Sequence, residues 1–120
     1  VMDSKKLSEN AKNIIEDSEN EIFVSGISFW ELAIKTQLGK MKFENFNILH
    51  LPNIATQYGF SVFTPTAYDY VTFSELPVVE NHKDPFDRML IHTALRNNLI
   101  LVSKDSCFDK YIDFGLQLLW

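Results

Sequence analysis

The amino-acid sequence predicts an α/β fold, with a mostly parallel sheet flanked by helices on both faces. Short strand-like runs alternate along the chain with segments of helical periodicity, which is the pattern of such folds. The run at 99–103 is almost entirely apolar, as expected of a strand buried on both faces. A chain of 120 residues, 46% of them hydrophobic, can form one domain with a substantial core. We therefore expect a single domain over residues 1–120.

The first elements follow from local sequence patterns. Ser8 is placed to cap a helix over residues 8–17, which carries apolar residues at helical spacing. Residues 21–25 form a β-rich run that is too short for a helix, so we expect a strand there. Gly26 and Ile27 should turn the chain into a helix over residues 28–38.

The middle of the chain is less regular. Residues 40–47 show no periodicity, and Phe43 and Phe46 are expected to pack back onto the body. A helix over residues 49–58 and a strand over residues 60–64 should follow.

The last part of the chain returns to the alternating pattern, and its best-marked helix starts at a proline. The expected elements are a helix that Thr66 can cap and that runs to about Leu76, a loop over 77–83, a helix over 85–97, a strand over 99–103, a turn or short helix over 105–111 and a strand over 116–119.

Composition excludes several classes of protein. No apolar run is long enough to cross a membrane, and the single cysteine, Cys107, excludes an internal disulfide. The formal net charge of −5 gives no general attraction for nucleic acid. A polyanionic substrate would therefore need local Lys and Arg residues together with a bound metal ion.

Three acidic residues lie at strand ends or helix starts, which the predicted fold brings to one edge of the sheet. Glu31 lies where a strand gives way to a helix, Asp87 lies at the start of the 85–97 helix, and Asp105 follows the 99–103 strand. Strand carboxyl ends and the helix starts after them line one edge of a parallel sheet. Because clustered carboxylates repel one another unless a cation offsets their charge, a divalent metal site is the first hypothesis.

Each acid also has a structural explanation. Glu31 could complete a capping box with Ser28, or pair with Lys35 one turn later. Asp84 could cap the 85–97 helix, with Asp87 favoured in its first turn by the helix dipole. Asp105 could likewise cap a short helix, with the Ser103 hydroxyl beside it.

Other constellations are weaker. His50, His82 and His92 lack the spacing of a zinc site, and His92 is better explained as a partly buried packing residue. The chain also lacks a glycine-rich phosphate loop and a nucleophile elbow.

In its acidic residues and the sequence around them, the chain resembles PIN-domain ribonucleases of the VapC toxin type, which belong to type II toxin–antitoxin systems. The resemblance rests on four blocks and on the closing Leu118-Leu-Trp120. The blocks are 21–35, 39–43, 84–91 with its Asp-Pro-Phe-Asp-Arg sequence, and 99–105.

The resemblance implies an endoribonuclease that binds Mg²⁺ or Mn²⁺ and cleaves RNA with metal-activated water. Matched position by position, Glu31, Asp87 and Asp105 would be the catalytic, metal-binding acids. Asp84 and Ser103 would lie next to the metal ligands without binding the metal themselves. Lys83, Arg88 and Lys104 would contact the RNA. It also implies a cytoplasmic protein that pairs with an antitoxin and forms a homodimer.

The chain departs from this pattern at its start. Family members begin with a central strand that carries another Asp, whereas this sequence begins at Val1 just before its first helix. We therefore expect an N-terminally truncated domain whose activity is impaired by the missing acid, a gap filled by another chain, or a further N-terminal segment. The alternative function is a catalytically inactive PIN-like module that binds an antitoxin or dimerises.

Overall fold

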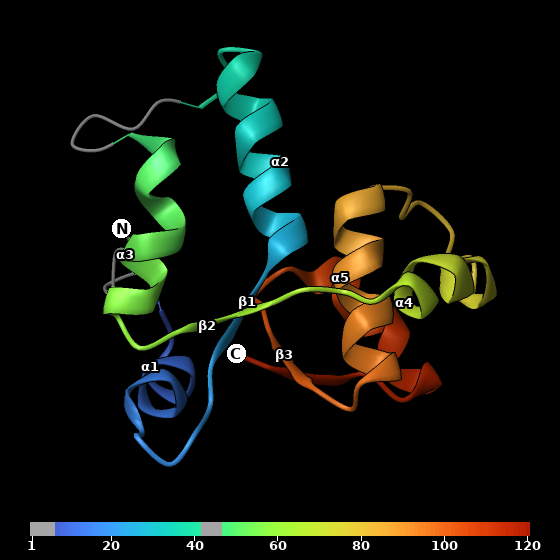
Figure 1. Ribbon diagram of the computed structural model, residues 1–120. Helices are drawn as coiled ribbons and strands as arrows, with labels where there is room; N and C mark the ends of the chain where they lie inside the picture. Colours follow the sequence, from blue (N-terminus) through green and yellow to red (C-terminus); the bar gives the residue numbers. More distant parts are fainter. Residues whose placement is uncertain (1–6, 42–46) are drawn as a thin grey trace. The chain divides into compact units, whose positions relative to one another are not determined.

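The computed structural model describes residues 7–41 and 47–120, and its internal contacts divide them into two compact units (Figure 1). Unit 1 is the segment Glu21–Thr64. Unit 2 combines residues 7–20 with Pro65–Trp120. The expected positions of Phe43 and Phe46 lie outside the described residues.

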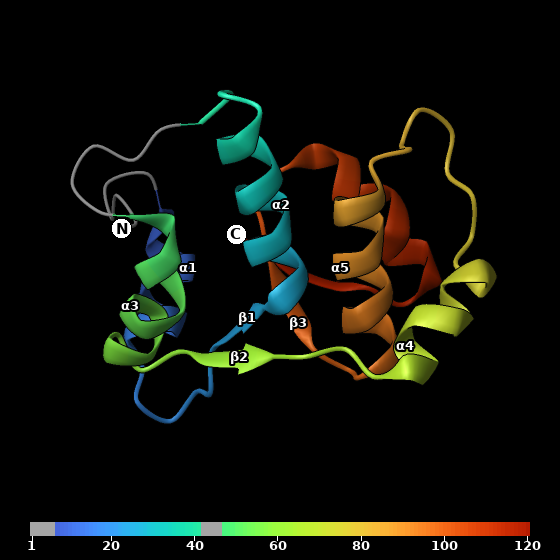
Figure 2. The ribbon, with the colours of Figure 1, turned by 45° about the horizontal axis from the view of Figure 1, so that its top comes forward.

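Unit 1 is built on a pair of parallel strands. Strand β1 (Phe23–Ser25) lies beside β2 (Ser61–Phe63) in Figure 2. The two strands are parallel, with Val24 opposite Val62. Between them the chain passes through α2 (Gly26–Gln37), the short 3₁₀ helix η2 (Ile48–His50) and α3 (Leu51–Gln57). Parallel pairing requires such a crossover, because the chain must return to the same end of the sheet before the second strand.

Helix α2 starts earlier than predicted, and this changes the role of Ser28. Ser25 is the N-cap, and its hydroxyl accepts a hydrogen bond from the backbone N–H of Ile27 at 3.2 Å. Gly26 is therefore helical rather than a turn residue. The earlier start gives α2 an additional half turn directly after β1 and buries Ile27. The capping box between Ser28 and Glu31 is wrong, because Ser28 lies inside the helix.

Unit 2 contains α1 and all elements after β2. Strands β3 and β4 are parallel, with Leu101 opposite Leu118. A nine-residue 3₁₀ helix, η4, joins them and is longer than the predicted turn. The elements are α1 (Glu9–Glu16), α4 (Ala67–Val71), η3 (Thr72–Glu75), α5 (Pro85–Arg96), β3 (Ile100–Val102), η4 (Ser106–Phe114) and β4 (Gln117–Leu119).

The core of unit 2 lies between α5 and η4. Ile91 and Tyr111 are completely buried there, and Phe108 packs beside them. The rest of this cluster is formed by Leu76, Ala94 and Leu116. Burial of large apolar side chains on both helices fixes η4 against α5, and so fixes the residues at their starts, Asp105 and Asp87.

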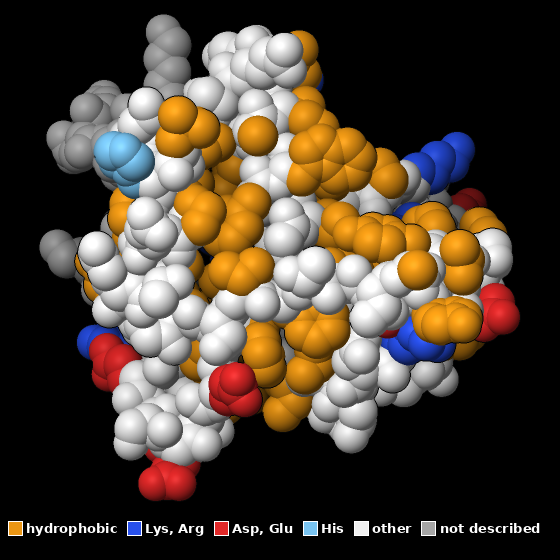
Figure 3. All heavy atoms as spheres, viewed as in Figure 1, with side chains coloured by type: hydrophobic (Ala, Val, Ile, Leu, Met, Phe, Trp, Pro, Cys, Tyr) orange, Lys and Arg blue, Asp and Glu red, His pale blue; other side chains and the backbone are white. Residues whose placement is uncertain are grey.

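The α/β class and the parallel strand pairing are confirmed. The four described strands form two pairs, β1 with β2 and β3 with β4, where one sheet was predicted. In the part of the chain that the structure describes, each helix is too short or too polar to span a lipid bilayer. Exposed hydrophobic side chains gather on α4, where Tyr68, Tyr70 and Val71 face solvent (Figure 3).

Candidate active site

Asp87 lies in the first turn of α5, where the capping group of the helix holds the backbone in place. Asp84 is the N-cap, as predicted, and its Oδ1 accepts hydrogen bonds from the backbone N–H groups of Phe86 at 2.9 Å and Asp87 at 3.1 Å. Pro85 occupies the first helical position. The Asp87 side chain keeps about a quarter of its surface accessible, at 27%. A carboxylate at this place is partly open to an ion or substrate.

Asp105 is the N-cap of η4, as Asp84 is the N-cap of α5. Its Oδ1 accepts a hydrogen bond from the backbone N–H of Cys107 at 2.9 Å, so its capping role is also correct. The Ser103 hydroxyl accepts a hydrogen bond from the Asp105 backbone N–H at 3.1 Å. Ser103 therefore shapes the turn that presents Asp105, which is exposed at the end of β3.

The thiol of Cys107 lies next to the Asp105 carboxylate, which accepts a hydrogen bond from the Cys107 backbone N–H. Its pKa is raised, first by the hydrogen bond to Asp105 and by the negative charge of that carboxylate, and to a smaller extent by the charge of Asp87. The convergence of Asp87 with Asp105, at the starts of two different helices, stays a prediction.

A buried histidine lies beside Asp87. The Nε2 atom of His82 is 3.6 Å from Oδ2 of Asp87, and the histidine is only 5% exposed. Its Nδ1 atom is 2.8 Å from the Tyr111 hydroxyl. Neither residue is marked as functional by a local sequence pattern, because a histidine in a polar loop carries no sign of burial and Tyr111 fits an ordinary core position.

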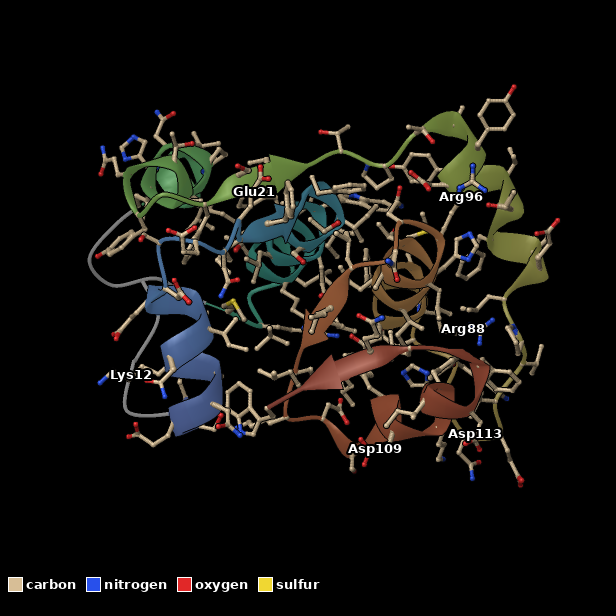
Figure 4. All side chains as sticks on the ribbon, turned by 90° about the horizontal axis from the view of Figure 1, so that it is seen from below. Lys12, Glu21, Arg88, Arg96, Asp109 and Asp113 are labelled. Carbon is tan, nitrogen blue, oxygen red and sulfur yellow. The ribbon has the colours of Figure 1, made fainter. Side chains whose placement is uncertain are left out.

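Arg88 is held by contacts inside unit 2. One guanidinium nitrogen donates to the backbone carbonyl of Pro77 and to the Tyr111 hydroxyl, both at 3.1 Å. The guanidinium also lies over the ring of Phe73, 5.4 Å from its centre. Figure 4 places Arg88 between the loop after η3 and the segment of η4. Lys83 and Lys104, the other predicted RNA contacts, are exposed.

Glu31 belongs to unit 1, in the second turn of α2. Its Oε2 is 3.2 Å from the Lys35 ammonium, so the predicted pairing one turn apart is confirmed. A partly exposed pair at this spacing contributes only about 0.3–0.5 kcal/mol. The convergence of Glu31 with Asp87 and Asp105 stays a prediction.

The donor chemistry of the Asp87 and Asp105 pair fits a hard divalent cation. Within residues 7–41 and 47–120, no group of three or more His, Cys, Asp or Glu side chains is arranged to hold a metal ion. Mg²⁺, however, usually binds through one or two carboxylates and completes its shell with water and substrate phosphate. The partly exposed carboxylate of Asp87 and the exposed carboxylate of Asp105 are donors of this kind.

Another carboxylate of unit 2, Asp69, has hydrogen-bond donors for both of its oxygens. It is 1% exposed, forms a capping box with Thr66, and accepts hydrogen bonds at Oδ1 from Arg96 at 2.9 Å and Asn97 at 3.2 Å. Figure 4 shows Arg96 beside α4. Burial alone would raise the pKa of Asp69, but these hydrogen bonds outweigh it, and the pKa lies below its ordinary value.

His92 is buried in the same region, as predicted. Its Nε2 atom is 2.9 Å from the Thr72 hydroxyl, and its ring packs edge-on against Phe73. Burial is the main cause that lowers the pKa of His92, so the neutral ring is favoured. Its contacts within unit 2 account for this residue without any role in chemistry.

Comparison with known proteins gives one family. The sequence matches the model of the PIN domain over residues 1–113, which covers the starts of α2 and α5 and the end of β3. No curated protein matches the sequence.

Proposed function

Because the chain belongs to the PIN-domain family, we propose that it is a Mg²⁺- or Mn²⁺-dependent endoribonuclease, the toxin of a toxin–antitoxin pair. PIN domains are typically metal-dependent nucleases, so family membership supports nuclease activity and the use of divalent metals. The choice of RNA, the toxin role and the preference for Mg²⁺ or Mn²⁺ are parts of the proposal.

One observation carries the assignment of the site. Asp87 lies in the first turn of α5 and Asp105 caps η4, and these two helices share the buried core that contains Ile91 and Tyr111. Two carboxylates brought together at these helix starts would be electrostatically unfavourable without a cation. A divalent ion would stabilise the pair.

Each site residue has a distinct task in this proposal. Asp87 and Asp105 would hold the ion through hard oxygen ligands, with Glu31 as the third acid. Asp84 and Ser103 would fix the backbone on which these ligands stand, through the hydrogen bonds described above. The bound ion would supply an activated water molecule and offset the negative charge that develops on the phosphate.

The substrate would be held by charge and accessibility. Lys83 and Lys104 are exposed next to the Asp84–Asp87 turn and to Asp105 in the sequence, where they can contact phosphates that flank the cleaved bond. Arg88 would act on the site indirectly or through its remaining N–H groups, since one nitrogen is already engaged. We propose single-stranded or loop RNA, whose backbone is accessible to a partly open site.

The decisive experiment measures cleavage of a mixed single-stranded RNA by the full chain with Mg²⁺, with Mn²⁺ and with EDTA. Asp87→Asn should abolish cleavage, whereas Asp113→Asn should not, because Asp113 is an exposed aspartate of η4 without a place in the site. Equal cleavage by the wild type and Asp87→Asn would indicate a contaminating nuclease. A wild type that cleaves no RNA but binds a partner would favour the inactive interaction module.

The toxin role requires a partner and a phenotype. We propose that the protein acts in the cytoplasm, that a cognate antitoxin covers the site and suppresses cleavage, and that the chain forms a homodimer. Co-expression with the product of the adjacent gene should restore growth to cells in which the chain alone arrests it.

Light scattering of the purified chain measures its oligomeric state directly, and a monomer at all concentrations would overturn the dimer.

A further inference from the structure

We propose that His82 positions the Asp87 carboxylate, and that Tyr111 and Arg88 hold His82 in the one tautomer able to do so. This role deepens the proposed function and rests on Asp87 being a metal ligand. The Nε2 atom of His82 is buried and has no hydrogen-bond partner among the described residues, which is uncommon for a buried polar atom. That atom lies 3.6 Å from Oδ2 of Asp87.

The contacts of Tyr111 determine which nitrogen of His82 carries the proton. Tyr111 is completely buried, and its hydroxyl oxygen accepts an N–H from Arg88 at 3.1 Å. The hydroxyl hydrogen then needs an acceptor, and Nδ1 of His82 is 2.8 Å away. Tyr111 therefore donates to Nδ1, which must be unprotonated, and the proton of the neutral ring resides on Nε2.

The opposite tautomer leaves a buried group unsatisfied. If Nδ1 carried the proton, Tyr111 would accept two hydrogen bonds, and its own O–H would have no acceptor within the described part of the chain. A buried O–H without an acceptor is costly. The N–H of Nε2 is therefore the end of a chain that runs from Arg88 through Tyr111 and His82 toward Asp87.

The surroundings keep this chain rigid. Arg88 is fixed by the Pro77 carbonyl and the Phe73 ring. The His82 ring packs edge-on against Phe108, with ring centres 5.9 Å apart. A rigid donor 3.6 Å from a carboxylate oxygen is slightly beyond hydrogen-bond distance, so a small rotation of Asp87 on binding a cation can complete the bond. Partners of this kind orient metal-binding carboxylates and typically change metal affinity by about 10–100-fold.

The tautomer is tested by long-range ¹H–¹⁵N NMR of the histidine rings in the full metal-free chain. His82 should show the Nε2–H pattern, and Tyr111→Phe should remove the preference. The rings of His92 and His50 serve as internal references. An Nδ1–H pattern, or a spectrum that Tyr111→Phe leaves unchanged, would overturn the hydrogen-bond chain.

The positioning role is tested by Mn²⁺ affinity. His82→Phe keeps a ring in the pocket but removes both nitrogens, and should weaken Mn²⁺ binding about 10–100-fold. His82→Gln, whose amide N–H can replace that of Nε2, should recover part of the loss. The matched control is His92→Phe, the same change at an equally buried histidine, which should bind Mn²⁺ like the wild type.

The outcomes separate this inference from the proposed function. A wild type that binds no Mn²⁺ refutes the function itself and with it the role of His82. Wild-type binding that His82→Phe leaves unchanged refutes only the positioning role. If His82→Phe does not fold, the double variant His82→Phe/Tyr111→Phe leaves no buried O–H unpaired and gives the same test.

Discussion

Asp69 and Asp87 are two carboxylates of the same unit in opposite situations. Asp69 is buried and satisfied by Thr66, Arg96 and Asn97, with a lowered pKa. Asp87 is partly exposed, acts on the same thiol as Asp105, and faces a buried nitrogen that lacks a hydrogen-bond partner among the described residues. A buried carboxylate whose oxygens all accept hydrogen bonds has a structural role. Like charges at a position open to solvent are instead typical of a binding site.

The largest expected effect is on activity. Asp87→Asn should lower RNA cleavage at least about 1,000-fold, because a metal ligand supports several kcal/mol of transition-state stabilisation. Thermal unfolding should change little, since the Asp87 side chain is not part of the core. A variant that loses stability together with activity would place Asp87 in the structural class with Asp69.

Asp69→Ala should show the converse. Losing the cap and the buried hydrogen bonds should lower the free energy of unfolding by about 3 kcal/mol. Urea denaturation measures this loss directly. Below the unfolding transition, cleavage per folded molecule should stay close to that of the wild type, and a specific loss of cleavage would contradict the distinction between the two carboxylates.

How far the sequence predicts this contrast depends on the kind of contact. Ser8, Thr66 and Asp84 were identified as helix caps because capping depends on residues only two or three positions apart. The start of α2 was misplaced because Ser25 and Ser28 are both able to cap, and the choice depends on burial of Ile27 after β1.

Contacts between distant segments were harder to predict. The pairing of Asp87 with Asp105 follows only from the rule that strand ends and helix starts share one sheet edge, and it stays a prediction. The bonds of His82 to Tyr111 and of Asp69 to Arg96 join segments more than 25 residues apart and depend on how η4 and α5 pack in the folded unit. No local pattern encodes them.

Acid should weaken unit 2 in two stages. His92 has a lowered pKa in the folded state, so the unfolded chain binds a proton on this ring more readily than the folded chain does. The free energy of unfolding therefore falls as the pH drops below about 6.5, by at most about 1.4 kcal/mol per pH unit. Asp69, also with a lowered pKa, stabilises the fold above its unfolded pKa, and this contribution is lost as the pH falls from about 3.9 through the folded pKa. Urea titrations at a series of pH values measure both stages, and His92→Gln should remove the first.

The smallest effect concerns Cys107. Removing the carboxylate charge in Asp105→Asn should lower the thiol pKa toward its ordinary value, and iodoacetamide should then react a few-fold faster at pH 8. Asp87→Asn should give a smaller increase, since its charge is the lesser influence. Asp113→Asn is the control. Equal rates in all four proteins would mean that neither carboxylate acts on this thiol.

The most direct test of the central claim is Mn²⁺ binding followed by electron paramagnetic resonance. The wild type should bind Mn²⁺ saturably, Asp87→Asn and Asp105→Asn should each lose that binding, and folded Asp69→Asn should retain it. Unchanged binding in Asp87→Asn and Asp105→Asn would contradict the assignment of this carboxylate pair as a metal site.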